Sequence, residues 1–163
     1  MLPEPLHPAV VHFPIVLALL APVICAALVL AIRRRRAPAR AWIAMLVLQA
    51  AVAGSAWLAV ETGEGDEEKV ERVVAESRIE EHEEAAERFL WLAALVLPLA
   101  AAGLAGGALG NGARVVTLVA TLGVAWAVMD VGHKGGELVY RHGAASAWSD
   151  AATTPARTAR HDD

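Results

Sequence analysis

The chain has 163 residues, of which 56% are hydrophobic and 20% charged, and its formal net charge is -4. The charged residues fall in blocks separated by long uncharged stretches, which excludes an ordinary soluble domain and indicates a membrane protein. The single cysteine, Cys25, lies in an apolar stretch, so the sequence has no disulfide framework, no thiolate metal cluster and no CxxCH haem-attachment motif.

Four apolar stretches of the chain predict four membrane-spanning helices. A helix that rises about 1.5 Å per residue needs about 20 apolar residues to cross a hydrocarbon core about 30 Å thick. The first stretch follows the acidic residue Glu4 and precedes the basic run Arg33–Arg36, so we expect a retained anchor rather than a cleaved signal peptide. The predicted spans are residues 9–32, 41–60, 85–109 and 114–131.

Glycine-rich segments predict where the last two spans end. Gly110–Gly112 has the composition of a turn after the third span, and Gly132–Gly136 closes the fourth, because glycine makes helix continuation costly. The predicted fold is an all-α, integral membrane four-helix bundle formed by one domain, residues 1–145. Residues 146–163 lack an apolar pattern and predict a disordered tail, so His161 is excluded from any site.

The basic residues predict the orientation, since lysine and arginine are retained in short cytoplasmic loops. The loop between the first two spans holds Arg33–Arg36 and Arg40, and the turn before the fourth holds Arg114, with no acidic residue in either. Residues 61–88 carry twelve acidic residues against four basic ones and belong outside. We therefore expect a multi-pass protein of the inner or plasma membrane with both termini outside.

The acidic segment itself predicts an amphipathic outer helix between spans two and three. Asp66 is a suitable N-cap, and Val70, Val73 and Val74 recur at helical spacing after it. The alternative is a solvated acidic face that keeps this loop outside.

The histidines are the residues best suited to carry chemistry. Imidazole is a common ligand of haem iron, copper, zinc and non-haem iron, and helical bundles build such sites on facing helices. On the predicted topology His7 and His12 begin span one, His82 precedes span three, and His133 ends span four, shortly before His142. Three helices are therefore expected to bring imidazoles to the outer face.

Two prolines shape the start of the first span. Pro8 directly follows His7 and Pro14 comes two residues after His12, and proline suits the first helical turn but disrupts deeper positions. Either the helix begins at Pro8 and bends near Pro14, or it begins near Pro14 with His12 as its cap. On a straight helix the two histidines would lie about 140° apart, so only an irregular start would let both converge.

Acidic residues supply further candidates for the site. Asp130 lies one helical turn before His133 and could accept its second N–H, as groups behind metal-bound histidines do. An ion pair of Asp130 with Arg141 or Lys134 is the alternative. Glutamates that surround His82 could serve as further ligands or bases, although such a run is more often a solvated face. They are Glu80, Glu81, Glu83 and Glu84.

Several motifs together resemble the domain-of-unknown-function 2231 family of predicted membrane proteins. They are His-Pro-x-x-x-His-Phe-Pro-Ile starting at His7, Thr62-Gly63 after span two, His82 before span three, and His-x-Gly-Gly-x-Leu-Val-Tyr-x-His-Gly starting at His133. The resemblance covers residues 6–145 and implies a four-helix membrane protein. It also implies a redox setting, because such domains are sometimes joined to Rieske iron–sulfur or c-type cytochrome domains. Neither kind of module is present in this chain.

Three functions remain open. The leading hypothesis is a membrane redox subunit that binds haem b between two of the histidines His7, His12, His82 and His133. The second is a copper, zinc or non-haem iron site formed by three or four of the same histidines with a carboxylate such as Asp130 or Glu61. The third is a non-catalytic assembly subunit of a membrane complex.

The expected partners are the lipid bilayer and redox proteins, with a second copy of the chain left open. No nucleic acid partner is expected, and no Walker, GxSxG or HExxH motif is present.

Overall fold

The computed structural model describes residues 5–148, and every regular element in that part of the chain is helical. The long helices alternate with short connections, one of which contains a turn of 3-10 helix, and a second 3-10 helix follows the last long helix. The elements are α1 (His7–Val10), α2 (His12–Arg33), η1 (Ala39–Trp42), α3 (Ile43–Val70), α4 (Glu76–Ala102), α5 (Gly107–Tyr140) and η2 (Ala144–Trp148).

Four helical segments are long and apolar enough to cross a membrane. Their lengths are 27, 32, 27 and 34 residues. Because about 20 residues are enough to cross the hydrocarbon core, each segment either tilts or extends beyond it. The predicted all-α, four-span architecture is confirmed. The four segments are His7–Arg33, Ala39–Val70, Glu76–Ala102 and Gly107–Tyr140.

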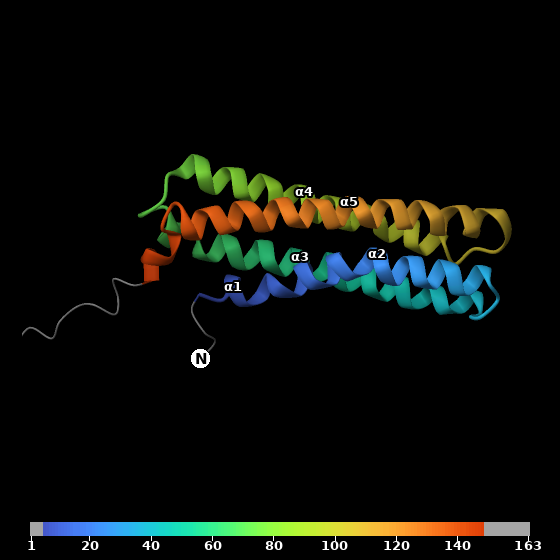
Figure 1. Ribbon diagram of the computed structural model, residues 1–163. Coiled ribbons are helices and arrows are strands. Elements are labelled where there is room, and N and C mark those ends of the chain that lie inside the picture. The colour runs from blue at the N-terminus through green and yellow to red at the C-terminus, as the bar shows by residue number, and fades with distance from the viewer. Residues whose placement is uncertain (1–4, 149–163) are drawn as a thin grey trace, which may run out of the picture.

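The helices run up and down, and each packs against its two neighbours around the bundle (Figure 1). Helices α2 and α4 each contact both α3 and α5, whereas the diagonal pairs make no close backbone contact within the described residues. The start of α1, the α3–α4 turn and the end of α5 therefore meet at one end of the bundle. We call it the histidine end, after His7 and His82. The opposite arginine end carries Arg33–Arg36, Arg40 and Arg114.

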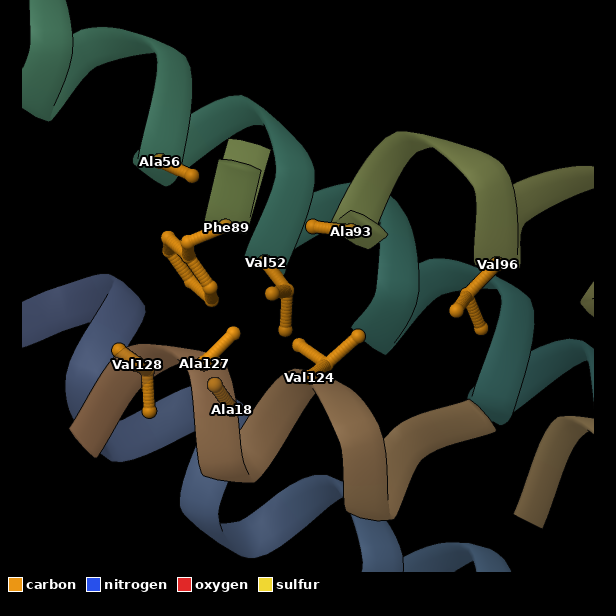
Figure 2. Packing of buried hydrophobic residues seen from close by; sticks show 9 residues of the cluster. All are labelled: Ala18, Val52, Ala56, Phe89, Ala93, Val96, Val124, Ala127 and Val128. Carbon is orange, nitrogen blue, oxygen red and sulfur yellow. The ribbon is translucent and has the colours of Figure 1, made fainter. Parts of the chain in front are cut away.

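The central core between the four helices is made almost entirely of alanine and valine around one aromatic ring, Phe89 (Figure 2). Small side chains let helices approach closely, which is how membrane helices gain packing contacts. Large apolar side chains such as Trp91 and Trp126, 68% and 71% exposed, point outward as expected of lipid-facing positions. The buried core residues are Ala18, Val52, Ala56, Phe89, Ala93, Val96, Val124, Ala127 and Val128.

The first span begins at the first of its two prolines and is irregular near the second. Pro8 lies in the first turn of α1. Val11 joins α1 to α2 with helical angles, φ -59° and ψ -23°, and its N–H donates to the carbonyl of His7. Pro14 has no N–H that could donate to the carbonyl of Val10, so the helical hydrogen-bond pattern is interrupted between these two residues. The early start of the helix agrees with the first alternative, in which it begins at Pro8, and not with a start near Pro14.

The turn between the last two spans comes earlier than predicted. Helix α4 ends at Ala102 and α5 begins at Gly107, so the predicted turn Gly110–Gly112 lies within α5. Gly107 has a φ of 65°, which glycine adopts at little cost. A Cβ on Gly103 would come 2.2 Å from Nε1 of Trp42, so the last residue of η1 occupies the space beside that glycine. This contact joins residues far apart in the sequence, so the local sequence around the turn does not reveal it.

The fourth span also ends later than predicted. Helix α5 continues through Gly132–Gly136 to Tyr140, although each helical glycine costs about 1 kcal/mol. Gly135 lies directly against the ring of His82 on α4, and this close packing offsets the cost. The predicted disordered tail begins within η2, and its residues 149–163 lie outside the described part of the chain.

The acidic segment is helical but does not form a separate amphipathic helix. Helix α3 continues past Asp66 to Val70, and α4 begins after a short turn, so Asp66 is not an N-cap. Val70 and Val74 pack with Ile79 and Leu138 at the histidine end. These contacts with α4 and α5 explain why the two spans extend outward instead of leaving an independent helix between them.

At the arginine end, α2 closes in a Schellman turn whose left-handed residue is an arginine. Arg35 has a φ of 55°. The N–H of Arg36 donates to the carbonyl of Ala31 at 2.8 Å, and the N–H of Arg35 donates to Ile32 at 3.0 Å. Glycine is usual at this position, and an L-residue there costs about 1–2 kcal/mol.

Candidate functional site

His7 is held over the outer part of α3 by a backbone hydrogen bond. Its Nδ1 lies 2.8 Å from the carbonyl oxygen of Ala59 and 3.4 Å from Oγ1 of Thr62. Because a carbonyl only accepts, Nδ1–H is the donor, and Nε2 keeps a free lone pair. The ring lies on Gly63, where a Cβ would be 3.2 Å from Cε1. The arrangement is the one by which proteins orient a metal-binding histidine.

His82 faces His7 from α4. The two ring centroids are 6.3 Å apart, and the ring planes meet at 87°. The backbone carbonyl of Val131 interacts with the His82 ring. Nδ1 of His82 is buried and has no hydrogen-bond partner among the described residues. A buried nitrogen without a partner is costly, so it marks a place where a ligand could bind.

A cavity of about 290 Å³ opens beside the two imidazoles between α3 and α4. Four glutamates line it, two from each helix, and they repel one another electrostatically. Asp66 acts electrostatically on His7, and its Oδ2 is buried without a hydrogen-bond partner in the described chain. The cavity therefore combines two imidazoles with glutamates that form no ion pair within residues 5–148, and this favours a cation. The four glutamates are Glu64, Glu67, Glu83 and Glu87.

His12 does not join this pair. It is exposed on the outward surface beside Phe13, which is 66% exposed. Since α1 and α2 are nearly continuous through Val11, the separation of about 140° between His7 and His12 is retained. A helix that turns His7 inward must therefore turn His12 outward.

His133 also lies apart from the pair. Its side chain is 71% exposed, and its Nε2 is 3.7 Å from a carboxylate oxygen of Glu137. Asp130 is engaged elsewhere, because one of its oxygens lies 3.5 Å from Nζ of Lys134, which also donates to the carbonyl of Glu81 at 3.3 Å. The Asp130 to Lys134 ion pair, one of the alternatives from the sequence, is the one observed. Asp130 does not orient His133.

The sequence alone predicted only some of the acidic residues of the site. Of the glutamates flanking His82, only Glu83 lines the cavity. Asp66, Glu64 and Glu67 come from α3 and carry no metal-ligand motif. The one available signal was the four-residue spacing of Gly63 and Glu67, which places them on the same side of a helix.

A family model described as a predicted membrane protein (DUF2231) matches residues 3–147, nearly the whole described bundle. The chain belongs to the DUF2231 family. No curated protein and no solved structure matches it. The family description concerns the membrane location of this DUF2231 protein.

In this DUF2231 chain, His7 and His82 can supply two imidazole ligands to a metal ion. A third ligand would have to come from another group. Metal–nitrogen bonds of about 2.0–2.1 Å place the centroids of two coordinating imidazoles about 5–6 Å apart. The observed 6.3 Å between His7 and His82 is close to that range. Within residues 5–148 no three histidine, cysteine or acidic side chains already stand close enough to hold one ion. A carboxylate of the cavity would have to move inward, or water would complete the coordination.

Proposed function

We propose that this protein binds a transition-metal ion between His7 and His82 at the histidine end of the bundle. The observation that carries the proposal is the pair of imidazoles from α1 and α4, 6.3 Å apart beside an acidic cavity. Asp66, which acts electrostatically on His7, and Glu83, which lines the cavity, are candidates to complete the coordination. Imidazole with carboxylate is a ligand set suited to copper, zinc or non-haem iron.

The negative charge of the cavity favours binding of a metal cation over binding of haem. Haem b carries two propionates and needs a flat apolar slot around its iron. The larger cavity here is lined by four glutamates, and the apolar space beneath the two rings is only about 50 Å³. A dipositive ion would instead be stabilised by the same carboxylates.

Haem b is the second candidate, because one observation favours it. An axial pair of imidazoles is all that a b-type haem needs, and two imidazoles are brought together here. The Nδ1 of His7 donates to a backbone carbonyl, as in many haem and metal sites, which leaves Nε2 for iron. Haem binding would require the side chains around Phe89 and Ala86 to separate.

In either case we infer a redox or binding subunit of the inner or plasma membrane with the metal near its outer face. The outer placement follows from the basic connection between α2 and α3 at the opposite end. If the protein bound neither metal nor haem, the third hypothesis from the sequence, an assembly subunit of a membrane complex, would replace this proposal.

The test is metal binding by the purified full-length protein in detergent. After chelation and dialysis, Zn²⁺ and Cu²⁺ are titrated calorimetrically, and bound metal is counted by elemental analysis. We expect one ion per chain, and His7→Ala or His82→Ala should weaken binding by about 100-fold or more, since even groups behind metal ligands contribute about 10–100-fold.

His12→Ala and His133→Ala are matched controls, because both histidines are exposed outside the cavity. They should bind metal like the wild type. Equal losses in the control variants would contradict the assignment of His7 and His82. A Soret band in the protein as isolated, lost in His7→Ala and His82→Ala, would instead establish haem.

A further inference from the structure

We propose that the arginine end binds the headgroups of anionic phospholipids in the leaflet that it faces. The proposal rests on Arg33–Arg36 and Arg40, which lie at the end of α2 and in its connection to α3, and on Arg114 of α5, which contacts Trp42 in the same connection. It is independent of the metal site, which lies at the opposite end of the bundle (Figure 1).

The positive charge at this end is not compensated within the described chain. Arg33–Arg36 and Arg40 are exposed, and none of them forms an ion pair or a side-chain hydrogen bond with another residue in the range 5–148. No acidic residue occurs between residues 5 and 60 or between residues 88 and 129. Counter-charge must therefore come from outside the described residues.

The conformation of Arg35 indicates that its side chain is kept for a reason other than the fold. Its φ of 55° lies in the left-handed region, where glycine is usual at the end of a helix. The turn would be less strained with glycine. A residue whose backbone position is unfavourable and whose guanidinium has no internal partner is best explained by what that guanidinium binds.

Arg114 joins the two connections of the arginine end into one surface. Its Nε donates to the carbonyl of Gly103 at 2.8 Å, and a terminal N–H donates to Oδ1 of Asn111 at 3.2 Å. Its guanidinium carbon is 5.8 Å from the centre of the ring of Trp42, the last residue of η1. Arg114 is 6% exposed, so it adds positive charge at this end of the bundle from a buried position.

Anionic lipid is the occupant favoured by where these charges lie. The arginines follow directly on the last turn of a membrane-spanning helix, which is the depth of the headgroups. Clusters of four to eight basic residues immediately next to a span bind anionic lipids, with about a fivefold gain in affinity for each. Phosphate groups also match the planar fork of guanidinium.

The test compares thermal unfolding of the full-length protein in neutral detergent with added phosphatidylglycerol or phosphatidylcholine. We expect phosphatidylglycerol to raise the Tm of the wild type more than phosphatidylcholine does. Replacing Arg33–Arg36 with glutamine should remove most of this difference. The matched control replaces four arginines of the histidine end with glutamine, and it should retain the difference in Tm between the two lipids. The four are Arg72, Arg78, Arg88 and Arg141.

Arg35→Gly separates lipid binding from folding. It should raise the Tm in phosphatidylcholine, because the left-handed strain is relieved, and reduce the extra shift given by phosphatidylglycerol. An undiminished phosphatidylglycerol shift in the glutamine variant and in Arg35→Gly would overturn the proposal. So would a full shift with inorganic phosphate alone, which would indicate a free-anion site.

Discussion

At the scale of single residues, two glycines make room for the two imidazole rings. A Cβ at Gly63 would lie 3.2 Å from Cε1 of His7, and one at Gly135 would lie 3.1 Å from Cε1 of His82. Nearby Gly65 and Gly136 have open space around the same position. The glycines next to the rings therefore have a steric role that their neighbours lack.

Gly63→Ala should weaken metal binding without unfolding the protein. The added methyl group would press on the His7 ring and move it by a few tenths of an ångström, away from Ala59 and the position facing His82. Because metal sites tolerate little misplacement of a ligand, we expect about a 10-fold loss of affinity, measured by calorimetric titration with Zn²⁺.

Gly65→Ala is the matched control, on the same helix and two residues away. It meets nothing within 4 Å, so it should bind Zn²⁺ like the wild type and gain up to about 1 kcal/mol of helix stability. Equal affinity in the two variants would show that contact with Gly63 does not position His7.

At the scale of the helices, side-chain contacts at the arginine end hold α4 to its neighbours. Nε1 of Trp42 donates to the carbonyl of Ala100 at 2.8 Å, and Nε of Arg114 donates to the carbonyl of Gly103. The last carbonyls of a helix have no partners within that helix, and an unpaired one near the membrane is costly. Residues of α5 and of the turn before α3 thus complete the end of α4.

Gly103→Ala should destabilise the bundle at this point. Its Cβ would come 2.2 Å from Nε1 of Trp42, so the indole must move and lose its hydrogen bond to Ala100. Overpacking of this kind costs about 1–3 kcal/mol, and the lost hydrogen bond adds about 1 kcal/mol. The measurement is the midpoint of thermal unfolding in detergent.

Gly106→Ala provides the comparison in the same turn. Gly106 has an ordinary extended backbone, φ -80° and ψ 170°, and nothing within 4 Å of a Cβ. It should change stability by less than about 0.5 kcal/mol. A Tm for Gly103→Ala as high as that of Gly106→Ala would show that Trp42 can repack freely.

At the scale of the whole molecule, charge and apolar surface are segregated along the bundle axis. Acidic residues gather at the histidine end, and arginines without an ion pair in the described chain gather at the other. Exposed apolar side chains such as Trp91 and Trp126 lie on the helices between them. This distribution predicts an orientation with the arginine end in the cytoplasm and both termini outside.

Cysteine labelling of intact cells tests that orientation. In a Cys25→Ala background, Ser77→Cys lies on an exposed position of the histidine end and Ala39→Cys on an exposed position of the arginine end. We expect a membrane-impermeant maleimide to label Ser77→Cys directly and Ala39→Cys only after permeabilisation. The reverse pattern would invert the topology and place the metal site on the cytoplasmic side.

Much of the architecture could be predicted from local features of the sequence. The number of spans follows from the length of the apolar stretches, and the segregation of charge from the positions of Arg33–Arg36 and the acidic residues. These properties need no knowledge of which helices touch. The boundaries near Gly103 and Gly135 could not be predicted, because those glycines are explained by Trp42 and His82, distant in sequence.

The sequence by itself determined that this protein is a membrane bundle with histidines near one end, because hydropathy and spacing act locally along the chain. Only the tertiary structure decided that His7 faces His82 while His12 and His133 face outward. The physical reason is rotation about the helix axis: a helix presents one side to its neighbours, and that side is chosen by packing with distant residues such as Ala59 and Gly135.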